Sequence, residues 1–282
     1  MHEGTSRATS FGVDAEQYDR ARPSYPEELV QEIVEAARTG SARSGGTFDE
    51  AVDVLDVGCG TGIAARLIAA KGCRVLGVEA DERMAAVARG WGVSVETARF
   101  EEWDENGREF DLLSCGQAWH WIDPVAGSAK AAAVLRRGGS AALFWNEGSY
   151  SPEVKGALDR VYREIAPGLD DDSILLGLSI EQRLGAVCAA LRGTGSFEEP
   201  AVKPYPWRRS YSRAEWLDHL PTHSDHRALP SDLLAALLEA VGGVLDEFGG
   251  HLEVEYTAWL VLARQDAHKG SAGELGLPLP PP

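Results

Sequence analysis

The chain has 282 residues, of which 44% are apolar and 25% are charged, the balance typical of a globular protein. This composition excludes collagen-like, disordered and disulfide-scaffold classes. Lys and Arg total 27 against 44 Asp and Glu, so the formal charge is −17. Non-specific affinity for nucleic acid comes from neutralising phosphates, and an acidic chain has the wrong sign for it. We therefore expect no nucleic-acid partner.

Cysteine usage and the lack of long apolar segments indicate the compartment. The four cysteines, at positions 59, 73, 115 and 188, form no CxxC motif and no zinc-ligand spacing, so we expect no metal. The first 23 residues lack the apolar region of a secretory signal, and no stretch approaches the roughly 18 apolar residues of a membrane span. We expect a cytoplasmic protein with reduced thiols and no membrane partner. The oligomeric state is not indicated by any pattern.

Short apolar segments alternate with helical patterns up to residue 146. The predicted strands are 51–58, 74–80, 93–100, 110–116 and 140–146, and the predicted helices are about 26–38, 61–71, 81–90 and 124–137. Gly138-Gly139 is expected to end the last of these helices. Apolar strands that alternate with helices indicate a parallel sheet covered on both faces, which is a doubly wound α/β fold.

The pattern changes after Asn146. The later chain favours helices within 151–195 and over 230–247, and strands over 202–212 and 252–264. Pro204 and Pro206 favour an edge position for the first of these strands, because proline cannot donate to a ladder. The two late strands are expected to form an antiparallel pair at one edge of the sheet.

One domain with a helical insertion fits this order better than two domains. We expect a single domain over 11–265, with a core at about 48–147, a helical cap or insertion at about 151–200, and strands and helices at about 201–265. Residues 1–10 and 266–282 have the composition of disordered tails.

Three glycines at alternate positions, Gly58, Gly60 and Gly62, follow the first predicted strand. Glycine lets the backbone turn tightly and approach a ligand without a Cβ in the way. The loop lies where a doubly wound sheet binds cofactors, at the carboxyl ends of its strands. A plain strand-to-helix turn would need one glycine rather than three.

The spacing around this loop distinguishes between cofactors. A dinucleotide fingerprint would place its third glycine at position 63, which is Ile63, and a phosphate loop would carry a Lys that is absent here. Glu79, 21 residues after Gly58, ends the second strand and is placed to accept hydrogen bonds from two ribose hydroxyls. A ribose without phosphate indicates S-adenosylmethionine.

The segments DVGCGTG, GVEAD and FDLLSCGQAWHWID resemble the class I S-adenosylmethionine-dependent methyltransferases. Within them, the chain resembles the "type 11" group that includes trans-aconitate methyltransferase-like enzymes. AEQYDRARPSYP and PTHSDHRALP also take part, so the resemblance covers about residues 11–264. It implies a Rossmann-like, mostly parallel seven-stranded sheet with an antiparallel edge strand.

The same resemblance implies roles for individual residues. Asp56, Gly58, Gly60 and Gly62 would form the loop beneath the methionine and ribose, and Glu79 would hold the ribose hydroxyls. The remaining cofactor contacts would come from Ala80, Phe100 and Glu101 near the adenine, from Gln117 near the methionine, and from Tyr18 and Arg22 in a leader that covers the cofactor. Where the family usually shows an acidic and then a small residue, this chain has Arg99-Phe100, and Glu101 would substitute for the acid.

A polar and aromatic cluster follows the fourth predicted strand. Trp119 and Trp121 are candidates for substrate contact, with core packing as the alternative. His120 is the candidate catalytic residue, either as a general base or as a hydrogen-bonded histidine that orients its neighbours.

A second cluster of polar residues occurs late in the chain and contains His219, His223, Asp225 and His226. Pro221 interrupts the helix that would bring them together as metal ligands, so a surface or acceptor-site cluster is favoured over a metal site.

The predicted function is methyl transfer from S-adenosylmethionine to a small-molecule acceptor, with carboxylic acids among the candidates. A sulfonium is already a strong electrophile, so the protein mainly aligns the reactants and excludes water. The alternatives are an NAD(P)-type Rossmann oxidoreductase and a non-catalytic cofactor-binding protein of the same fold.

Overall fold

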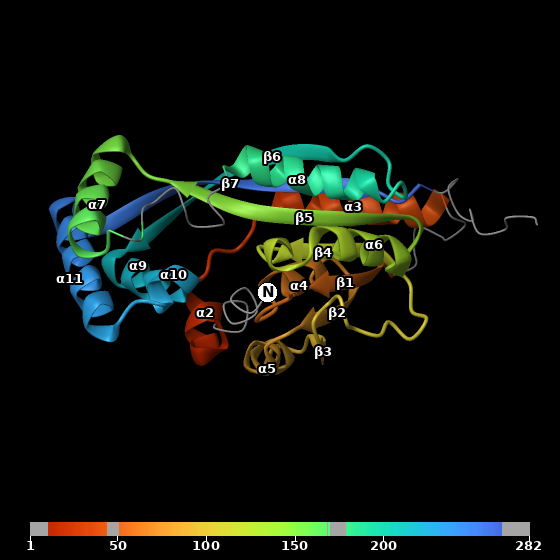
Figure 1. The fold of residues 1–282 in the computed structure, drawn as a ribbon, viewed down its shortest axis with the longest axis horizontal. Helices are drawn as coiled ribbons and strands as arrows, with labels where there is room; N and C mark the ends of the chain where they lie inside the picture. The colour runs from red at the N-terminus through yellow and green to blue at the C-terminus, as the bar shows by residue number, and fades with distance from the viewer. Residues whose placement is uncertain (1–10, 44–50, 168, 170–178, 267–282) are drawn as a thin grey trace, which may run out of the picture.

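A computed structural model describes residues 11–43, 51–167, 169 and 179–266. These residues form one seven-stranded sheet in the order β3-β2-β1-β4-β5-β7-β6 (Figure 1). The strands are β1 (Asp53–Val57), β2 (Arg74–Glu79), β3 (Ser94–Thr97), β4 (Phe110–Gly116), β5 (Leu135–Ser149), β6 (Ala201–Ser212) and β7 (His251–Arg264). Strands β1 to β5 pair in parallel, whereas β7 is antiparallel to both β5 and β6. The predicted mostly parallel sheet with an antiparallel edge is confirmed.

Helices cover both faces of this sheet. They are α2 (Ala15–Ala21), α3 (Glu27–Arg43), α4 (Ile63–Ala69), α5 (Glu82–Gly90), α6 (Pro124–Val134), α7 (Pro152–Ile165), α8 (Ile180–Gly193), α9 (Arg213–His219), α10 (Ser224–Arg227) and α11 (Ser231–Glu247). Short 3-10 turns are η1 (Phe11–Asp14), η2 (Trp119–Trp121) and η3 (Leu220–Thr222). None of the described helices combines the length and apolar character that crossing a membrane requires.

Two adjacent leucines of β4 show how the sheet separates two cores. Successive side chains of a strand point to opposite faces. Leu112 belongs to the core beneath α3 and α4, with Ile33 of α3. Leu113 belongs to the core beneath α6 and α8, with Leu184 of α8. The continuous apolar strands are therefore buried on both sides, as parallel strands require.

The expected end of the fourth predicted helix is wrong. Helix α6 ends at Val134, and β5 begins at Leu135 and runs through Gly138-Gly139. The pairing passes from Phe110↔Leu135 to Leu112↔Ser140, so the two glycines lie in a bulge of β5 and do not cap a helix. A Cβ on Gly139 would lie 2.9 Å from the carbonyl oxygen of Arg136 and 3.1 Å from that of Asp111, so a side chain would not fit without a shift of the backbone.

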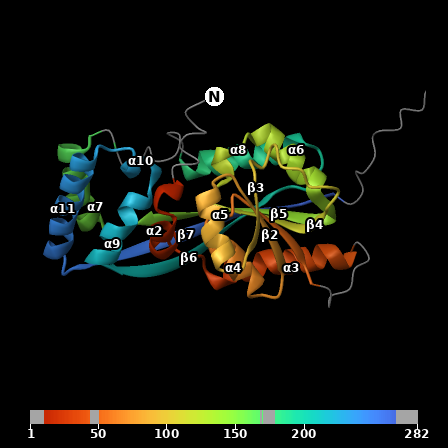
Figure 2. The ribbon, with the colours of Figure 1, turned by 90° about the horizontal axis from the view of Figure 1, so that it is seen from below.

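Strands β5, β6 and β7 continue well beyond the ends of the parallel strands. The last β4–β5 pair is Gly116↔Phe144, but the β5–β7 ladder reaches Ser149↔Glu255. Figures 1 and 2 show α7, α9, α10 and α11 gathered around these extended strand ends. We call this group of four helices the cap.

The cap has a hydrophobic core of its own. This core includes Leu158 of α7, Trp216 of α9 and Leu237 of α11. Three of its helices lie after residue 200, in the part that the sequence analysis assigned to the C-terminal strands and helices. The predicted tails, residues 1–10 and all but the first residue of 266–282, lie outside the described residues.

Candidate active site

A cavity of about 610 Å³ lies between the carboxyl ends of the parallel strands and the cap. Segments from the leader, the sheet loops and the cap all line it. The predicted site residues in its lining are Tyr18, Arg22, Gly58, Gly60, Glu79, Ala80, Phe100, Glu101, Gln117, His120 and Trp121. Asp56, Gly62 and Trp119 are not part of the lining. The structure therefore brings most of the predicted residues to one place.

The glycine loop turns sharply because all three glycines have positive φ angles, of 62°, 57° and 85°. The N–H of Gly58 donates to the carbonyl of Val78 at 2.8 Å, which ties the loop to β2. A Cβ on Gly58 would lie only 2.5 Å from the Cβ of Ala118. Gly62 begins α4 and lies outside the cavity, and a Cβ there would lie 3.2 Å from the Cβ of Ala88 in α5. Its role is therefore helix packing.

Glu79 ends β2 with its carboxylate fixed on both oxygens. Oε2 accepts from the N–H of Gly60 at 2.9 Å, and Oε1 accepts from the N–H of Asp81 at 2.9 Å. The residue is 8% exposed, and burial raises its pKa, which the hydrogen bonds from Asp81 and Gly60 partly oppose. Each carboxylate oxygen has a second lone pair, so Glu79 retains acceptor capacity toward a ligand in the cavity.

Asp56 lies beneath the loop and not in the cavity. It is 1% exposed, and its Oδ1 accepts from Ser114 Oγ at 2.5 Å. Burial raises the pKa of Asp56 to about 7, and the nearby charge of Glu79 adds to this rise. The carboxyl group therefore links β1 to β4 and supports the loop from below.

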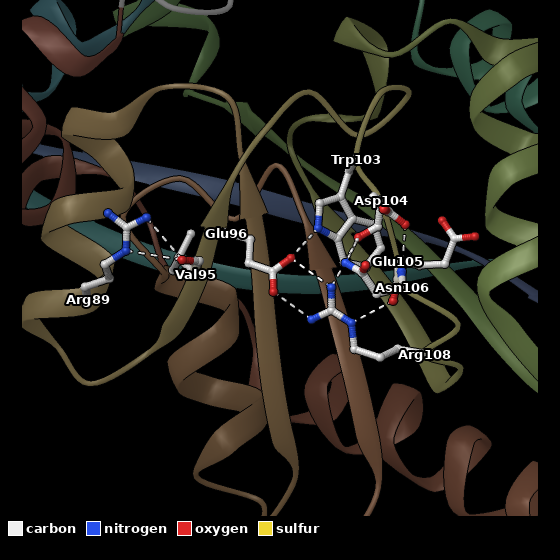
Figure 3. Close-up of polar contacts among 8 residues, drawn as sticks. All are labelled: Arg89, Val95, Glu96, Trp103, Asp104, Glu105, Asn106 and Arg108. Atoms are coloured by element: carbon white, nitrogen blue, oxygen red, sulfur yellow. Dashed lines mark hydrogen bonds and ion pairs between the residues drawn. The ribbon is translucent and has the colours of Figure 1, made fainter.

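Phe100 and Glu101 belong to the loop after β3. Glu96 of β3 holds a later part of this loop in place through Trp103 and Arg108 (Figure 3). Glu96 accepts from Trp103 Nε1 at 2.6 Å and from both terminal nitrogens of Arg108 at 2.6 and 2.9 Å. Such bidentate pairing fixes geometry as well as adding energy. Glu101 Oε1 in turn accepts from the N–H of Asp123 at 3.2 Å, which connects this loop to the start of α6.

Gln117 and His120 follow β4 on the cavity side. Gln117 has a φ of 57°, an uncommon conformation for a residue other than glycine, and such strain is found most often at functional sites. Burial, followed by the positive charges of Arg183 and Arg22, lowers the pKa of His120 to about 3. Its ring lies 4.6 Å from that of Trp121. The imidazole is therefore neutral at physiological pH and only weakly basic.

The two tryptophans of this segment have different surroundings. Trp121 lines the cavity. Trp119, also predicted to contact the substrate, is 2% exposed and lies in the core with its ring 6.2 Å from that of Phe100. A 3-10 turn has three residues per turn, so Trp119 and Trp121 point in different directions from η2. Trp121 therefore lines the cavity, whereas Trp119 packs in the core.

The leader closes one side of the cavity. The guanidinium carbon of Arg22 lies 5.0 Å from the centre of the Tyr18 ring, and its Nη2 donates to the carbonyl of Thr222 at 3.1 Å. Arg22 Nε is buried and has no hydrogen-bond partner within the described parts of the chain. A buried donor of this kind is costly unless a ligand satisfies it.

Sequence reasoning missed Arg183, which lines the cavity together with Arg22 and Arg99. Arg183 of α8 pairs with Glu147 of β5, and its side chain is 12% exposed. Its Nε and Nη1 are buried and find no partner among the residues that the structure describes. No sequence signal marks this residue, because it reaches the cavity only through the packing of α8 across the sheet.

The late histidine cluster lies in the cavity wall and not on the surface. His219, His223, Asp225 and His226 all contribute to the lining. In the described ranges, no group of three or more His, Cys, Asp or Glu side chains is arranged to hold a metal ion. Their position in the lining places them within reach of a ligand in the cavity, and a role as an acceptor site stays a prediction.

Comparisons with known proteins identify the central part of the chain. Residues 54–139 match the family described as "Methyltransferase domain". An uncharacterized methyltransferase of Mycobacterium tuberculosis is 34% identical over 141 residues, which cover 49% of this chain and 52% of the relative. A ubiquinone biosynthesis O-methyltransferase of Aromatoleum aromaticum is 36% identical over 94 residues, which cover 30% of this chain and 40% of that protein. The chain thus spans about half the length, or less, of the curated relatives it matches.

Solved structures show the same fold. A protein of Anaeromyxobacter dehalogenans described as a type II methyltransferase has a TM-score of 0.60 and 23% identity, over 88% of this chain and 99% of that one. A phosphoethanolamine N-methyltransferase of Haemonchus contortus, solved with S-adenosylhomocysteine, has a TM-score of 0.51 and 15% identity, over 94% of this chain and 59% of that one. The trans-aconitate methyltransferase-like subgroup stays a prediction. Residues 54–139 thus match a methyltransferase domain, and the described residues have the fold of these methyltransferase structures.

Proposed function

We propose that this protein transfers the methyl group of S-adenosylmethionine to a small-molecule acceptor. The observation that carries the proposal is the carboxylate of Glu79, held by the N–H groups of Gly60 and Asp81 at the edge of the cavity. A fixed acceptor beside a glycine loop suits the two hydroxyls of a ribose. Ile63 stands where a dinucleotide site needs its third glycine, which disfavours an NAD(P)-type oxidoreductase.

The cofactor would lie along the loops that follow β1, β2 and β3. Gly58 and Gly60, which have no side chains, would let the backbone lie close to the methionine and ribose portions, and Glu79 would bind the ribose hydroxyls. The adenine would lie among Ala80, Phe100 and Glu101, which line the adjoining wall. Asp56 and Gly62 would act indirectly, by holding the loop from outside the cavity.

The methionine portion would extend toward Gln117 and the leader. The buried Nε of Arg22 has no partner in the described segments, and a carboxylate is the group that best satisfies a guanidinium. Tyr18 would cover this end of the cofactor, since its ring lies against the Arg22 side chain. The leader residues would therefore bind the cofactor and exclude water from it.

The acceptor would occupy the remainder of the cavity, toward the cap. A space of about 610 Å³ is within the range of small-molecule sites, and it must hold cofactor and acceptor together. Trp121 and His120 would contact the acceptor, with His120 orienting it, because a pKa of about 3 makes this imidazole a poor base. Transfer itself would be an in-line displacement in which alignment and water exclusion provide most of the acceleration.

Calorimetry and a turnover assay test the proposal. S-adenosylmethionine and S-adenosylhomocysteine are expected to bind, whereas NAD and ATP are not. Methyl-labelled cofactor incubated with a metabolite library that includes carboxylic acids would identify the acceptor. Tight NAD binding without a response to S-adenosylmethionine would overturn the proposal, and cofactor binding without any turnover would indicate the non-catalytic alternative.

A further inference from the structure

The cap places a hydroxyl, an imidazole and a carboxylate in one hydrogen-bonded chain. Tyr162 Oη of α7 lies 2.7 Å from His226 Nε2 of α10, and His226 Nδ1 lies 2.8 Å from Asp225 Oδ1. All three residues line the cavity, and none has a role in cofactor binding as proposed above. His226 is 5% exposed, so the chain is protected from solvent at its centre.

The carboxylate determines the direction of these hydrogen bonds. Burial alone would raise the pKa of Asp225, but the hydrogen bonds that it accepts from the ring and the backbone N–H of His226 lower it below its usual value. Because an ionised carboxylate only accepts, His226 donates from Nδ1, and the neutral imidazole carries its lone pair on Nε2. The Tyr162 hydroxyl then donates to Nε2, and as it gives up this proton the phenolic oxygen can take another.

Of the three histidines in this cluster, His226 is the one suited to act as a base. His223 packs with its ring 5.7 Å from that of His226, and its Nε2 lies 3.0 Å from Nε2 of His219 in α9. Burial and the positive charge of Arg22 lower the pKa values of both, that of His219 to about 3. His226 alone of the three has a carboxylate on its ring, so an added proton is stabilised there.

We propose that Tyr162 and His226 form a proton relay that deprotonates the acceptor, with Asp225 as the positioning residue. The acceptor is then a hydroxyl compound whose O–H proton must leave during transfer, and not a carboxylate that is already ionised. This inference rests on the proposed methyltransferase function and names its substrate class.

The relay accounts for the bond that forms, the bond that breaks and the proton that leaves the acceptor. A lone pair of the acceptor oxygen forms the new bond to the methyl carbon, and the electrons of the breaking S–C bond return to sulfur, giving a neutral thioether. The acceptor proton moves to the Tyr162 oxygen as the Tyr162 proton moves to His226 Nε2. The resulting imidazolium is stabilised by Asp225 and later releases its proton to water.

Two phenols of different acidity test whether the hydrogen bond between Tyr162 and His226 carries a proton or only joins α7 to α10. The probes are 4-ethylphenol, which is protonated in neutral water, and 4-nitrophenol, which is largely ionised, each incubated with methyl-labelled S-adenosylmethionine. Removing the hydroxyl in Tyr162→Phe is expected to slow transfer to 4-ethylphenol about 10²–10⁴-fold, the usual range for acid–base catalysis. Transfer to 4-nitrophenol is expected to slow far less. The control Tyr205→Phe removes a hydroxyl outside the cavity and is expected to change neither rate.

The pH profile provides an independent readout. For the wild type, kcat/KM for 4-ethylphenol is expected to rise with pH to a plateau, because the relay takes up a proton only in its deprotonated form. Asp225→Asn removes the charge that stabilises the imidazolium, so the plateau is expected to fall. His251→Gln, at an exposed histidine on β7, serves as the control and keeps the wild-type profile.

Several outcomes would overturn the relay. Equal losses for both phenols in Tyr162→Phe, or an unchanged pH profile in Asp225→Asn, would assign these residues to cap structure alone. Methylation of benzoate but of neither phenol, or S-adenosylhomocysteine binding with transfer to neither phenol, would refute the hydroxyl acceptor. Failure of the wild type to bind S-adenosylhomocysteine would instead refute the proposed function itself.

Discussion

Arg22 and Thr222 are separated by 200 residues in sequence, yet Arg22 Nη2 donates to the Thr222 carbonyl at 3.1 Å. The contact joins the leader to η3, which connects helices α9 and α10 of the cap. It holds a guanidinium at the cavity wall whose Nε is not satisfied by any described residue. The leader thus forms part of the cavity wall.

Arg22→Gln is expected to weaken binding of S-adenosylhomocysteine by about 10-fold or more, because a hydrogen bond to a charged group contributes about 1.5–3 kcal/mol. Binding of 5′-methylthioadenosine, which lacks the amino-acid portion, should remain near the wild-type value. Calorimetry with both ligands measures the difference. Arg20→Gln is the matched control, since Arg20 forms only an exposed ion pair with Asp218. If the binding of both ligands weakened equally, Arg22 would not contact the methionine portion of the cofactor.

Glu79→Ala is expected to weaken binding of S-adenosylhomocysteine by more than tenfold for each ribose hydrogen bond that is lost. The variant should stay folded but lose about 1–3 kcal/mol of unfolding free energy, since the buried N–H of Asp81 loses its acceptor. Calorimetry and urea denaturation measure the two effects. Glu82→Gln, at an exposed carboxylate of α5, is the control. Unchanged cofactor affinity in Glu79→Ala would show that the ribose lies elsewhere.

The cofactor side of the site could be predicted because its signals are local. Gly58 and Glu79 lie at the ends of neighbouring strands, and parallel strands bring their carboxyl ends to one edge of a sheet whatever the rest of the chain does. A mostly parallel sheet of seven strands with an antiparallel edge followed from the resemblance and from the alternation of strands with helices.

The cap side could not be predicted from local patterns. Tyr162 lines the cavity from α7, in the cap around the extended end of β5, and Arg183 lines it from α8, which packs on the sheet. The start of β5 was hidden as well, because Gly138-Gly139 has the appearance of a helix stop but lies in a bulge of the strand. Whether Trp119 or Trp121 faces the cavity likewise depends on the 3-10 turn η2, which the hydrophobic pattern of the sequence does not predict.

Asp56 makes stability depend on pH in a predictable direction. A folded pKa of about 7 lies above the unfolded value near 3.8, so the protonated carboxyl favours folding. This contribution is complete below about pH 4 and is lost as pH rises toward 7, which costs on the order of 4 kcal/mol by linkage. Asp56→Asn keeps an acceptor for Ser114 without the charge. In urea denaturation, the stability of the variant relative to the wild type should therefore be greater at pH 8 than at pH 5.5. The same difference at both pH values would show that Asp56 is not protonated near neutrality.

His120 is expected to orient the acceptor without acting as the base. Its pKa of about 3 means that it stays neutral from pH 5 to pH 9, so no limb of the rate profile in that range should belong to it. His120→Asn keeps a hydrogen-bonding group of similar reach and should retain activity within about tenfold of the wild type, below the 10²–10⁴-fold of a lost base. The measurement is kcat across this pH range for both proteins, with cofactor affinity and thermal stability as controls. A thousandfold loss of kcat with both controls unchanged would make His120 the base, and the relay through Tyr162 would then have no proton to carry.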